Sequence, residues 1–131
     1  MATFQFDLVS PEQILFSGEV EHVVVPGTEG EFGVLAGHAP LVAMLRPGIL
    51  RILGANEQRI VVFGGFAEVS PQGLTVLADK AMPVEDVDAS VIAEEIQDTE
   101  EDISDTTNEA RRDKLRTKLE QLKAVQAALE H

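Results

Sequence analysis

Residues 66–78 read FAEVSPQGLTVLA, and their pattern indicates the fold class of the first part of the chain. Two short apolar runs flank the tetrapeptide SPQG at 70–73. Pro71 suits the second position of a β-turn and Gly73 the fourth, because proline fixes φ and glycine is favoured where such a turn closes. A turn of this kind between two apolar runs predicts a pair of short antiparallel strands.

The same pattern continues on both sides of this hairpin. Thr3–Val9 alternates apolar and polar residues, which is typical of a strand with one buried face. Glu19–Val25 indicates a second long strand, and Ile14–Phe16 a shorter one before it. Further strand-like runs lie at 41–45, 49–53 and 59–63. About ten short strands with no room for a crossover helix predict an antiparallel β-sandwich over residues 1–84, with a barrel as the alternative.

The rest of the chain has a different period. Residues 85–131 contain no glycine or proline, whereas residues 1–84 contain all ten glycines and all six prolines, which predicts a separate helical domain. Residues spaced three and four apart form two stripes there, typical of helices with one buried face: Ala89, Ile92, Ile96, Thr99, Ile103, Thr106 and Ala110, then Leu115, Leu119, Leu122, Val125 and Leu129. We predict a helical hairpin that breaks near residues 104–108, with Thr106 and Glu109 as a capping box. The two stripes would bury each other or pack on the sandwich.

The composition excludes several classes of function. Twenty-three acidic residues against ten basic ones give a formal net charge of −13, which disfavours nucleic acid and anionic lipid as partners because both are negatively charged. The chain has no cysteine, so disulfides and thiolate chemistry are ruled out and a reducing compartment is compatible. No apolar run approaches the roughly 20 residues that cross a bilayer, and the first residues lack the pattern of a signal peptide. We therefore expect a soluble, acidic protein that does not insert into lipid.

Charge is divided unevenly within the predicted hairpin. Residues 85–109 carry eleven acidic residues and no basic one. The helix that follows carries six basic residues: Arg111, Arg112, Lys114, Arg116, Lys118 and Lys123. Two interpretations stay open. Either the helices present solvated faces that attract each other weakly, or the basic helix leaves its partner for another acidic surface.

A glycine-rich loop is predicted at Pro26–Pro40, which reads PGTEGEFGVLAGHAP. Glycine lets a backbone turn sharply or lets another group approach closely. A phosphate-binding loop usually supplies a lysine to neutralise the anion, whereas this loop supplies Glu29 and Glu31 and no cation. We therefore expect no nucleotide here, and favour either a set of shaped turns or contact with a protein partner.

Residues 98–109, DTEEDISDTTNE, have part of a calcium-loop pattern. Acidic residues stand at positions 1, 3 and 5, and a glutamate at position 12. Position 6, where such a loop needs glycine, is Ile103, which also belongs to the first helical stripe. We therefore expect no calcium site.

The three histidines give no catalytic or metal-binding arrangement. His22 falls in a predicted strand, His38 in the predicted loop and His131 at the end of the chain, and no ligand spacing joins them to other side chains. We interpret His38 as a loop residue that is hydrogen-bonded to backbone. The last three residues, Leu-Glu-His, also occur at the ends of affinity-tagged chains, so no role is assigned to His131.

Three stretches together resemble the epsilon subunit of bacterial F-type ATP synthases. They are DLVSPEQILFSGEVEHV (7–23), VVVPGTEGEFGVLAGHAPLVAMLRPGILRI (23–52) and GGFAEVSPQGLTVLAD (64–79). The most specific part is the pattern P-G-x-E-G-E-x-G-x-x-x-G-H-A-P within the second stretch. A sandwich followed by a helical hairpin is also the order of parts in that family, which the hairpin resembles in length and character only.

The resemblance implies a non-catalytic subunit at the foot of the rotating central stalk, on the cytoplasmic face of the bacterial inner membrane. Its partners would be the gamma subunit and the polar loops of the c-ring, which it would clamp together so that proton-driven rotation reaches the catalytic head. The residues implied to contact ring or gamma are Ser10, Glu29, Gly30, Glu31, Gly33, His38 and Ala43. Of these, the resemblance implies that Ser10, His38 and the region around Ala43 lie toward gamma. The basic second helix would meet acidic segments of the alpha and beta catalytic subunits and slow ATP hydrolysis.

One motif departs from the family. Relatives that bind ATP carry the pattern I/L-D-x-x-R-A where this chain reads VDASVI at 87–92. Asp88 is present, but Val91 stands in place of the arginine and Ile92 in place of the alanine. Because an aliphatic side chain cannot neutralise phosphate, we expect neither ATP nor another cofactor to bind.

Two alternatives come from other functional classes. A free-standing sandwich that binds a small ligand would need a sizeable apolar pocket with convergent polar groups. A hydrolase would need a residue of shifted pKa in a cleft. Neither explains a glycine-rich acidic loop together with a charge-divided hairpin, so contact with protein partners is favoured.

Overall fold

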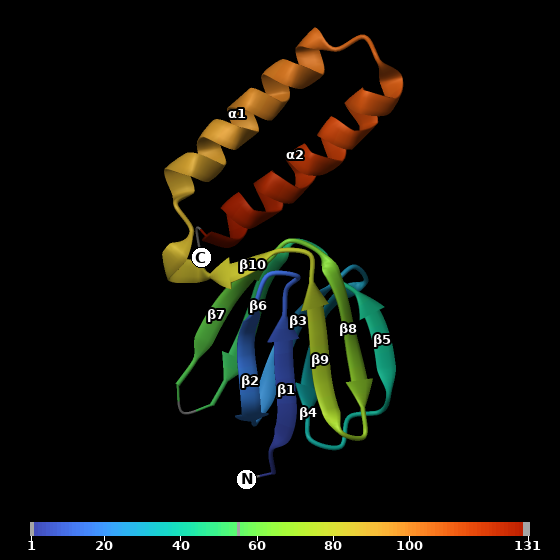
Figure 1. Cartoon of the computed structure of the whole chain (residues 1–131), viewed down its shortest axis with the longest axis vertical. Helices are drawn as coiled ribbons and strands as arrows, with labels where there is room; N and C mark the ends of the chain where they lie inside the picture. The colour runs from blue at the N-terminus through green and yellow to red at the C-terminus, as the bar shows by residue number, and fades with distance from the viewer. Residues whose placement is uncertain (1, 55, 130–131) are drawn as a thin grey trace. The chain divides into compact units, whose positions relative to one another are not determined.

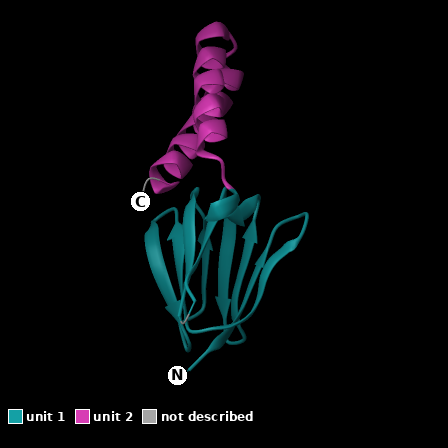
Figure 2. Ribbon diagram, turned by 90° about the vertical axis from the view of Figure 1, so that its left-hand side faces the viewer, with its two compact units in different colours: residues 1–86 teal, residues 87–131 magenta. Residues whose placement is uncertain are grey.

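A computed structural model describes residues 2–54 and 56–129. The chain forms two compact units, residues 1–86 and residues 87–131, which Figure 2 shows in different colours. His131, to which the sequence assigned no role, lies outside the described residues.

Within the described residues, the first unit contains ten strands and one short 3-10 helix (Figure 1). The strands are β1 (Phe4–Val9), β2 (Ile14–Val20), β3 (His22–Gly27), β4 (Gly30–Leu35), β5 (Leu41–Met44), β6 (Gly48–Leu53), β7 (Gln58–Val62), β8 (Gly65–Ser70), β9 (Gly73–Ala78) and β10 (Ala81–Pro83), and the short helix is η1 (Val84–Asp86). The predicted β-sandwich is confirmed.

The strands form two five-stranded sheets. The first sheet has the order β2-β1-β9-β8-β5 and the second has the order β10-β7-β6-β3-β4. Neighbouring strands are antiparallel except β1 and β9, which run parallel. The predicted turn at 70–73 joins β8 to β9, and Ser70 pairs with Gly73 across it.

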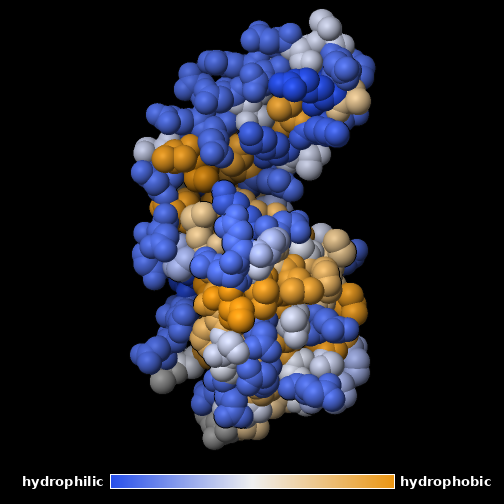
Figure 3. All heavy atoms as spheres, viewed as in Figure 1, coloured by the Kyte–Doolittle hydropathy of each residue, from blue (hydrophilic) through white to orange (hydrophobic). Residues whose placement is uncertain are grey.

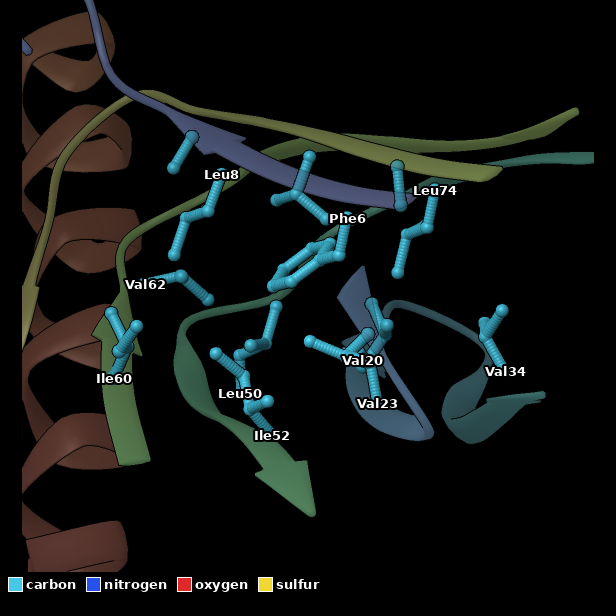
Figure 4. Close-up of a cluster of buried hydrophobic side chains, with 14 of the residues drawn as sticks. Phe6, Leu8, Val20, Val23, Val34, Leu50, Ile52, Ile60, Val62 and Leu74 are labelled. Atoms are coloured by element: carbon cyan, nitrogen blue, oxygen red, sulfur yellow. The ribbon is translucent and has the colours of Figure 1, made fainter. Parts of the chain in front are cut away.

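The core lies between the two sheets. Alternate residues of each strand point inward and are buried, as period-2 alternation requires. Phe6 occupies the middle of this core (Figure 4) and is fully buried. Its ring centroid lies 5.5 Å from that of Phe16. The residues around it come from both sheets and include Leu8, Leu50, Ile52 and Leu74.

The strand predicted at Glu19–Val25 is wrong. The chain instead forms β2 and β3 and changes sheets between them, at Glu21. Val20 and Val23 are both buried with two partly exposed residues between them. The alternation therefore slips by one residue at this point, which is incompatible with one regular strand.

The loop predicted at Pro26–Pro40 is also largely wrong. Most of it is strand: β3 extends to Gly27, and β4 pairs with β3 in antiparallel register. Phe32 and Val34 of β4 supply the alternating inward residues, and Val34 is fully buried. Thr28 and Glu29 form the turn between β3 and β4, and residues 36–40 form a loop between β4 and β5, as expected.

The second unit is a pair of helices, α1 (Ala89–Asp105) and α2 (Glu109–Leu129), packed against each other. The predicted break near residues 104–108 is confirmed. The buried residues come from both predicted stripes: Ile92, Ile96 and Thr99 on α1 and Leu122 and Val125 on α2. Because Thr99 is buried, its hydroxyl donates to the Glu95 carbonyl at 2.7 Å within its own helix.

The predicted capping box of Thr106 with Glu109 is wrong. Thr106 ends α1, and its N–H donates to the Asp102 carbonyl. Asn108 caps α2 instead, with its side-chain oxygen accepting from the Arg111 N–H at 3.0 Å. Asparagine is as good an N-cap as serine or threonine. Thr106 therefore ends α1 while Asn108 begins α2, and each of the two helix ends has its own capping residue.

Asp88 caps the start of α1. Its Oδ1 accepts from the Ser90 N–H at 2.9 Å and from the Ser90 hydroxyl at 2.7 Å. These hydrogen bonds, the Ser90 hydroxyl first, favour the ionised carboxylate and lower the pKa of Asp88 below its usual value. Over the described ranges, no helix has the length and apolar character that spanning a membrane requires.

Replacing Gly73 by alanine is expected to destabilise the sandwich. Gly73 pairs with Gln5 across the parallel strands, at a φ of 145°, and an added Cβ would lie 2.0 Å from the Gln5 carbonyl oxygen. Backbone strain and the clash together should lower the free energy of unfolding by about 3 kcal/mol. The measurement is urea unfolding of both chains. Gly18→Ala is the matched control, because its added Cβ would lie 3.7 Å from the nearest atoms and should change stability little.

The pKa of Asp88 should rise toward its usual value in Ser90→Ala, because that change removes the hydroxyl that favours the ionised form. The stability that this cap contributes is present above the unfolded-state pKa and is lost as the pH falls through the lower folded-state pKa. Titration of the Asp88 carboxyl by NMR measures this change. Ser104→Ala, near the other end of α1, should leave the Asp88 pKa as it was, and an unchanged pKa in Ser90→Ala would contradict the assignment of the cap.

Candidate functional site

The β3–β4 hairpin is tied to the end of β5 by backbone contacts between the two sheets. The Thr28 N–H donates to the Met44 carbonyl, and the Arg46 N–H donates to the Pro26 carbonyl, both at 2.9 Å. Gly27 and Leu45 form an isolated antiparallel bridge between them. These bonds hold the β3–β4 turn and β5, one of the two edge strands of the first sheet, side by side.

A groove of about 460 Å³ lies between this turn and β5. Four of the residues implied by the family resemblance line it together: Glu29, Gly30, Glu31 and Ala43. Apolar side chains from both walls complete it, chiefly those of Phe32 and of Leu41, Val42 and Met44. The groove therefore combines a mostly apolar lining with two carboxylates.

Gly27 shapes this groove by its lack of a side chain. A Cβ at Gly27 would lie 2.9 Å from the Gly30 carbonyl oxygen and 3.0 Å from the Phe32 ring. The ring of Phe32 thus occupies the space that a side chain at Gly27 would fill. Glycine at position 27 is therefore explained by close packing against the Phe32 ring, and not by the approach of a phosphate.

The two carboxylates of the groove are unpaired within the part of the chain that the structure describes. Glu29 and Glu31 are both exposed. Neither forms an ion pair or a side-chain hydrogen bond with any residue in 2–54 or 56–129. Exposed carboxylates without an internal partner are available to a cation from outside.

An apolar row crosses the outer face of the first sheet next to the groove. Successive strand pairings align its five members across the sheet: Met44, Phe66, Leu77, Val9 and Ile14. Ile14 is 68% exposed and Met44 60% exposed, and Phe66 and Leu77 are exposed as well. Figure 3 shows hydrophobic residues gathered over this part of the sandwich. Contiguous exposed apolar surface of this kind marks an interaction site.

The next row along the same face is polar except at its β5 end, where Val42 is 65% exposed. On the other four strands it contains Glu68, Thr75, Asp7 and Ser17, and the Ser17 hydroxyl donates to Asp7 Oδ1 at 2.6 Å. The apolar row is therefore a band at one end of the sheet and is not a general property of its surface. Ser10, another residue implied by the resemblance, borders a shallow hollow formed by Val9, Phe66 and Leu77 of this band.

His38 lies away from the groove. It follows the end of β4 at Leu35, whereas Glu29 and Gly30 stand at the start of that strand. His38 Nδ1–H donates to the Ala39 carbonyl at 2.6 Å, which confirms the predicted hydrogen bond to backbone. It borders a separate hollow of about 370 Å³ near Phe4. The structure thus does not bring His38 together with the two glutamates.

Gly33 lies within β4 outside the groove. It pairs with Val24 of β3, and the His22 ring lies across it, with Nε2 2.8 Å from the position that a Cβ would occupy. Gly33 therefore accommodates His22 on the outer face of the second sheet. Its place there is separate from both the groove and the apolar row.

The six basic residues of α2 do not act as one group. Arg112 pairs with Glu109 at 3.2 Å, and Arg116 with Asp113 at 3.8 Å, both within α2. Lys123 reaches Glu100 of α1 at 4.0 Å, the one ion pair between the two helices among the described residues. The other three, Arg111, Lys114 and Lys118, are exposed, and their spacing places them along one face of the helix. The weak attraction expected between solvated faces matches this single long ion pair.

In the segment 87–92, the two residues that differ from the ATP-binding pattern, Val91 and Ile92, lie in different environments. The side chain of Val91 is 46% exposed, whereas Ile92 is buried. Asp88 is engaged by Ser90 at the helix start. The described residues of this segment thus present no cation where the ATP-binding pattern has its arginine.

Sequence reasoning assigned no role to any of the five residues of the apolar row. Phe66 and Leu77 stood within predicted strands, and their outward direction could have been read from the buried residues between which they alternate. Their alignment with Met44 and Ile14 depends on pairing between strands far apart in sequence, which the alternation alone does not show. Phe32 was missed because its segment was expected to be loop.

Comparison with known proteins gives consistent matches. Residues 3–84 match the family model described as ATP synthase, Delta/Epsilon chain, beta-sandwich domain. The ATP synthase epsilon chain of Afipia carboxidovorans is 53% identical over 127 residues, which are 96% of this chain and 93% of that one. The ATP synthase epsilon chain of Rhodopseudomonas palustris strain TIE-1 is 62% identical over 104 residues, 79% of this chain and 77% of that one.

A solved structure agrees with these sequence matches. A chain in the structure of the Euglena gracilis mitochondrial ATP synthase, containing OSCP, F1 and c-ring, superposes with a TM-score of 0.84 at 29% identity, over 98% of this chain and 82% of that one. The family model covers more than half of the chain, and the Afipia relative covers nearly all of it. The chain therefore belongs to the ATP synthase epsilon chain family.

Proposed function

We propose that this chain is a non-catalytic rotor subunit that joins the gamma subunit to the c-ring of an ATP synthase. Its role is mechanical: it holds ring and stalk together so that rotation driven by proton flow reaches the catalytic head. The observation that carries the proposal is the apolar row of the first sheet, Val9, Ile14, Met44, Phe66 and Leu77.

The row has the properties of a permanent contact surface. Burying one large apolar side chain stabilises a complex by about 1.5–3 kcal/mol. Several such side chains in one band therefore offset a substantial part of the free-energy cost of association. The row also adjoins Ser10, one of the residues that the family resemblance directs toward gamma. We therefore assign gamma to this face.

The groove beside the row suits the second partner. Met44 belongs both to the apolar row and to the groove lining, so the two surfaces are continuous. A subunit that binds gamma on one surface and ring loops on the adjoining one would resist slippage between them. With both contacts made, the chain would lie on the cytoplasmic face of the bacterial inner membrane, as a peripheral component.

The helical hairpin is assigned a regulatory role. Arg111, Lys114 and Lys118 leave a basic face on α2 that α1 does not neutralise within the described residues. Acidic segments of the alpha and beta catalytic subunits would complement this face and draw the helix toward them, slowing ATP hydrolysis. His38, away from the groove, is assigned to the gamma subunit only through the family resemblance.

Leu77→Lys is expected to weaken gamma binding, because it places a charge in the middle of the apolar row. Loss of one buried apolar side chain and burial of an unpaired ammonium should raise the Kd at least about tenfold. The measurement is co-purification of this chain with the gamma subunit, followed by titration.

Thr75→Lys is the matched control for this change. Thr75 lies on the same strand and the same face, in the polar row beside Glu68 and Asp7, so a lysine there should leave gamma binding nearly unchanged. A chain that ends at Asp86 should also keep gamma binding, since the row lies in the first unit. Equal binding by both lysine variants would contradict the assignment of gamma to the row.

The chain is expected not to bind ATP, because Val91 supplies no positive charge for the phosphates. Calorimetric titration with magnesium and ATP should show no heat of binding at millimolar nucleotide. Val91→Arg is the informative variant, since Val91 is partly exposed and an arginine fits there without filling the core. Tight binding by the unaltered chain would overturn the expectation.

A further inference from the structure

Methionine is the only residue type in the chain that contains sulfur, since the sequence has no cysteine. The three methionines are Met1, Met44 and Met82, of which the structure describes the last two. Peroxides oxidise a methionine thioether to a sulfoxide, which changes a flexible apolar side chain into a polar one. The oxidant must reach the sulfur, so the exposure of Met44 and Met82 decides which of them reacts first.

Met44 is the more exposed of the two. It is 60% exposed on β5, an edge strand of the first sheet (Figure 1). Met82 is partly buried on β10, where it pairs with the fully buried Val61. We therefore expect a peroxide to reach the Met44 sulfur before that of Met82.

Met44 also stands where two contact surfaces meet. Among the five residues of the apolar row, it is the one that also lines the groove. Phe66, its neighbour in the row, has no side-chain donor, and the carboxylates of Glu29 and Glu31 in the groove accept hydrogen bonds and donate none. The oxygen of a sulfoxide at position 44 is itself an acceptor, so none of these three side chains satisfies it.

The fold does not depend on the Met44 sulfur. Met44 is not a member of the buried cluster that fills the sandwich. Its backbone pairs with Phe66 of β8, and its carbonyl accepts from the Thr28 N–H, so neither contact uses the thioether. Oxidation therefore changes the surface at Met44 and leaves the sandwich folded.

We propose that Met44 is a site of reversible oxidation by peroxide that controls binding of the gamma subunit. The thioether sulfur attacks one oxygen of the peroxide, and an S–O bond forms as the O–O bond breaks. With hydrogen peroxide the other oxygen leaves as water, so the sulfur loses two electrons and the peroxide gains them. A methionine sulfoxide reductase restores the thioether.

This inference rests on the proposed function for the identity of the partner, gamma. It adds a modification of the free chain that decides how well gamma binds. In the complex the sulfoxide oxygen would lose its water without a hydrogen bond from Phe66 or from the two glutamates, which opposes association.

The test treats the full-length chain alone with hydrogen peroxide, removes the peroxide and then titrates the chain with untreated gamma subunit. Mass spectrometry of peptides follows the sulfoxide at each methionine, and Met44 should oxidise at least about fivefold faster than Met82. The oxidised chain should bind gamma with a Kd at least about tenfold higher than before treatment. Methionine sulfoxide reductases should restore the original Kd.

Met44→Leu is the informative variant, because leucine has a similar volume and no sulfur. Whatever its affinity for gamma before treatment, its Kd should be the same after peroxide. Met82→Leu is the matched control, and peroxide should weaken its gamma binding as it does in the unaltered chain. A higher Kd in peroxide-treated Met44→Leu would overturn the proposal, because another oxidised group would then be responsible.

Three other results would also contradict it: faster oxidation of Met82 than of Met44, an unchanged Kd once Met44 is fully oxidised, and a urea midpoint that falls on oxidation, which would show damage to the fold. If the untreated chain did not bind gamma, the proposed function itself would fall, and control of gamma binding by Met44 with it. If the untreated chain bound gamma and oxidation of Met44 changed nothing, only this inference would fall.

Discussion

The functional surfaces depend on the backbone tie between the β3–β4 hairpin and the end of β5. The bonds from Thr28 and Arg46 and the Gly27–Leu45 bridge join an edge of one sheet to an edge of the other. Since backbone groups make this tie, many side chains are compatible with it, but its geometry leaves no room for a Cβ at Gly27. It sets the distance between the acidic hairpin and Met44, and so makes one continuous surface from an apolar band and a charged groove.

The apolar row depends on register. The pairing of β1 with β2 shifts between Leu8 and Val9, so that Val9 lies opposite Ile14 and not opposite Leu15. This bulge turns Ile14 outward and extends the band to the last strand of the sheet. A slip of one residue in any of the four pairings would move that strand's member of the band to the core face. The contact surface is thus a product of pairing across the whole sheet.

The sequence predicted the architecture well and the site only in part. Alternation and turn residues were enough for the sandwich and for the hairpin of residues 66–78, because both signals are local. The same signals failed at Glu19–Val25, where two buried valines break the alternation, and at Pro26–Pro40, where glycines suggested loop but close packing around Phe32 produced strand. Glu29, Gly30, Glu31 and Ala43 meet in one groove. His38 does not join them, because strand β4 separates Glu29 from His38. The spacing of residues in the Pro26–Pro40 pattern does not show that its two ends lie apart.

The exposed apolar band has a consequence for the time before assembly. A free chain presents this band and the unpaired edges of β4 and β5 to other copies, which is the combination that leads β-proteins to aggregate. A net charge of −13 on 131 residues opposes such encounters by mutual repulsion. The excess of acidic residues thus keeps the free subunit from aggregating until a partner binds and covers its exposed apolar band.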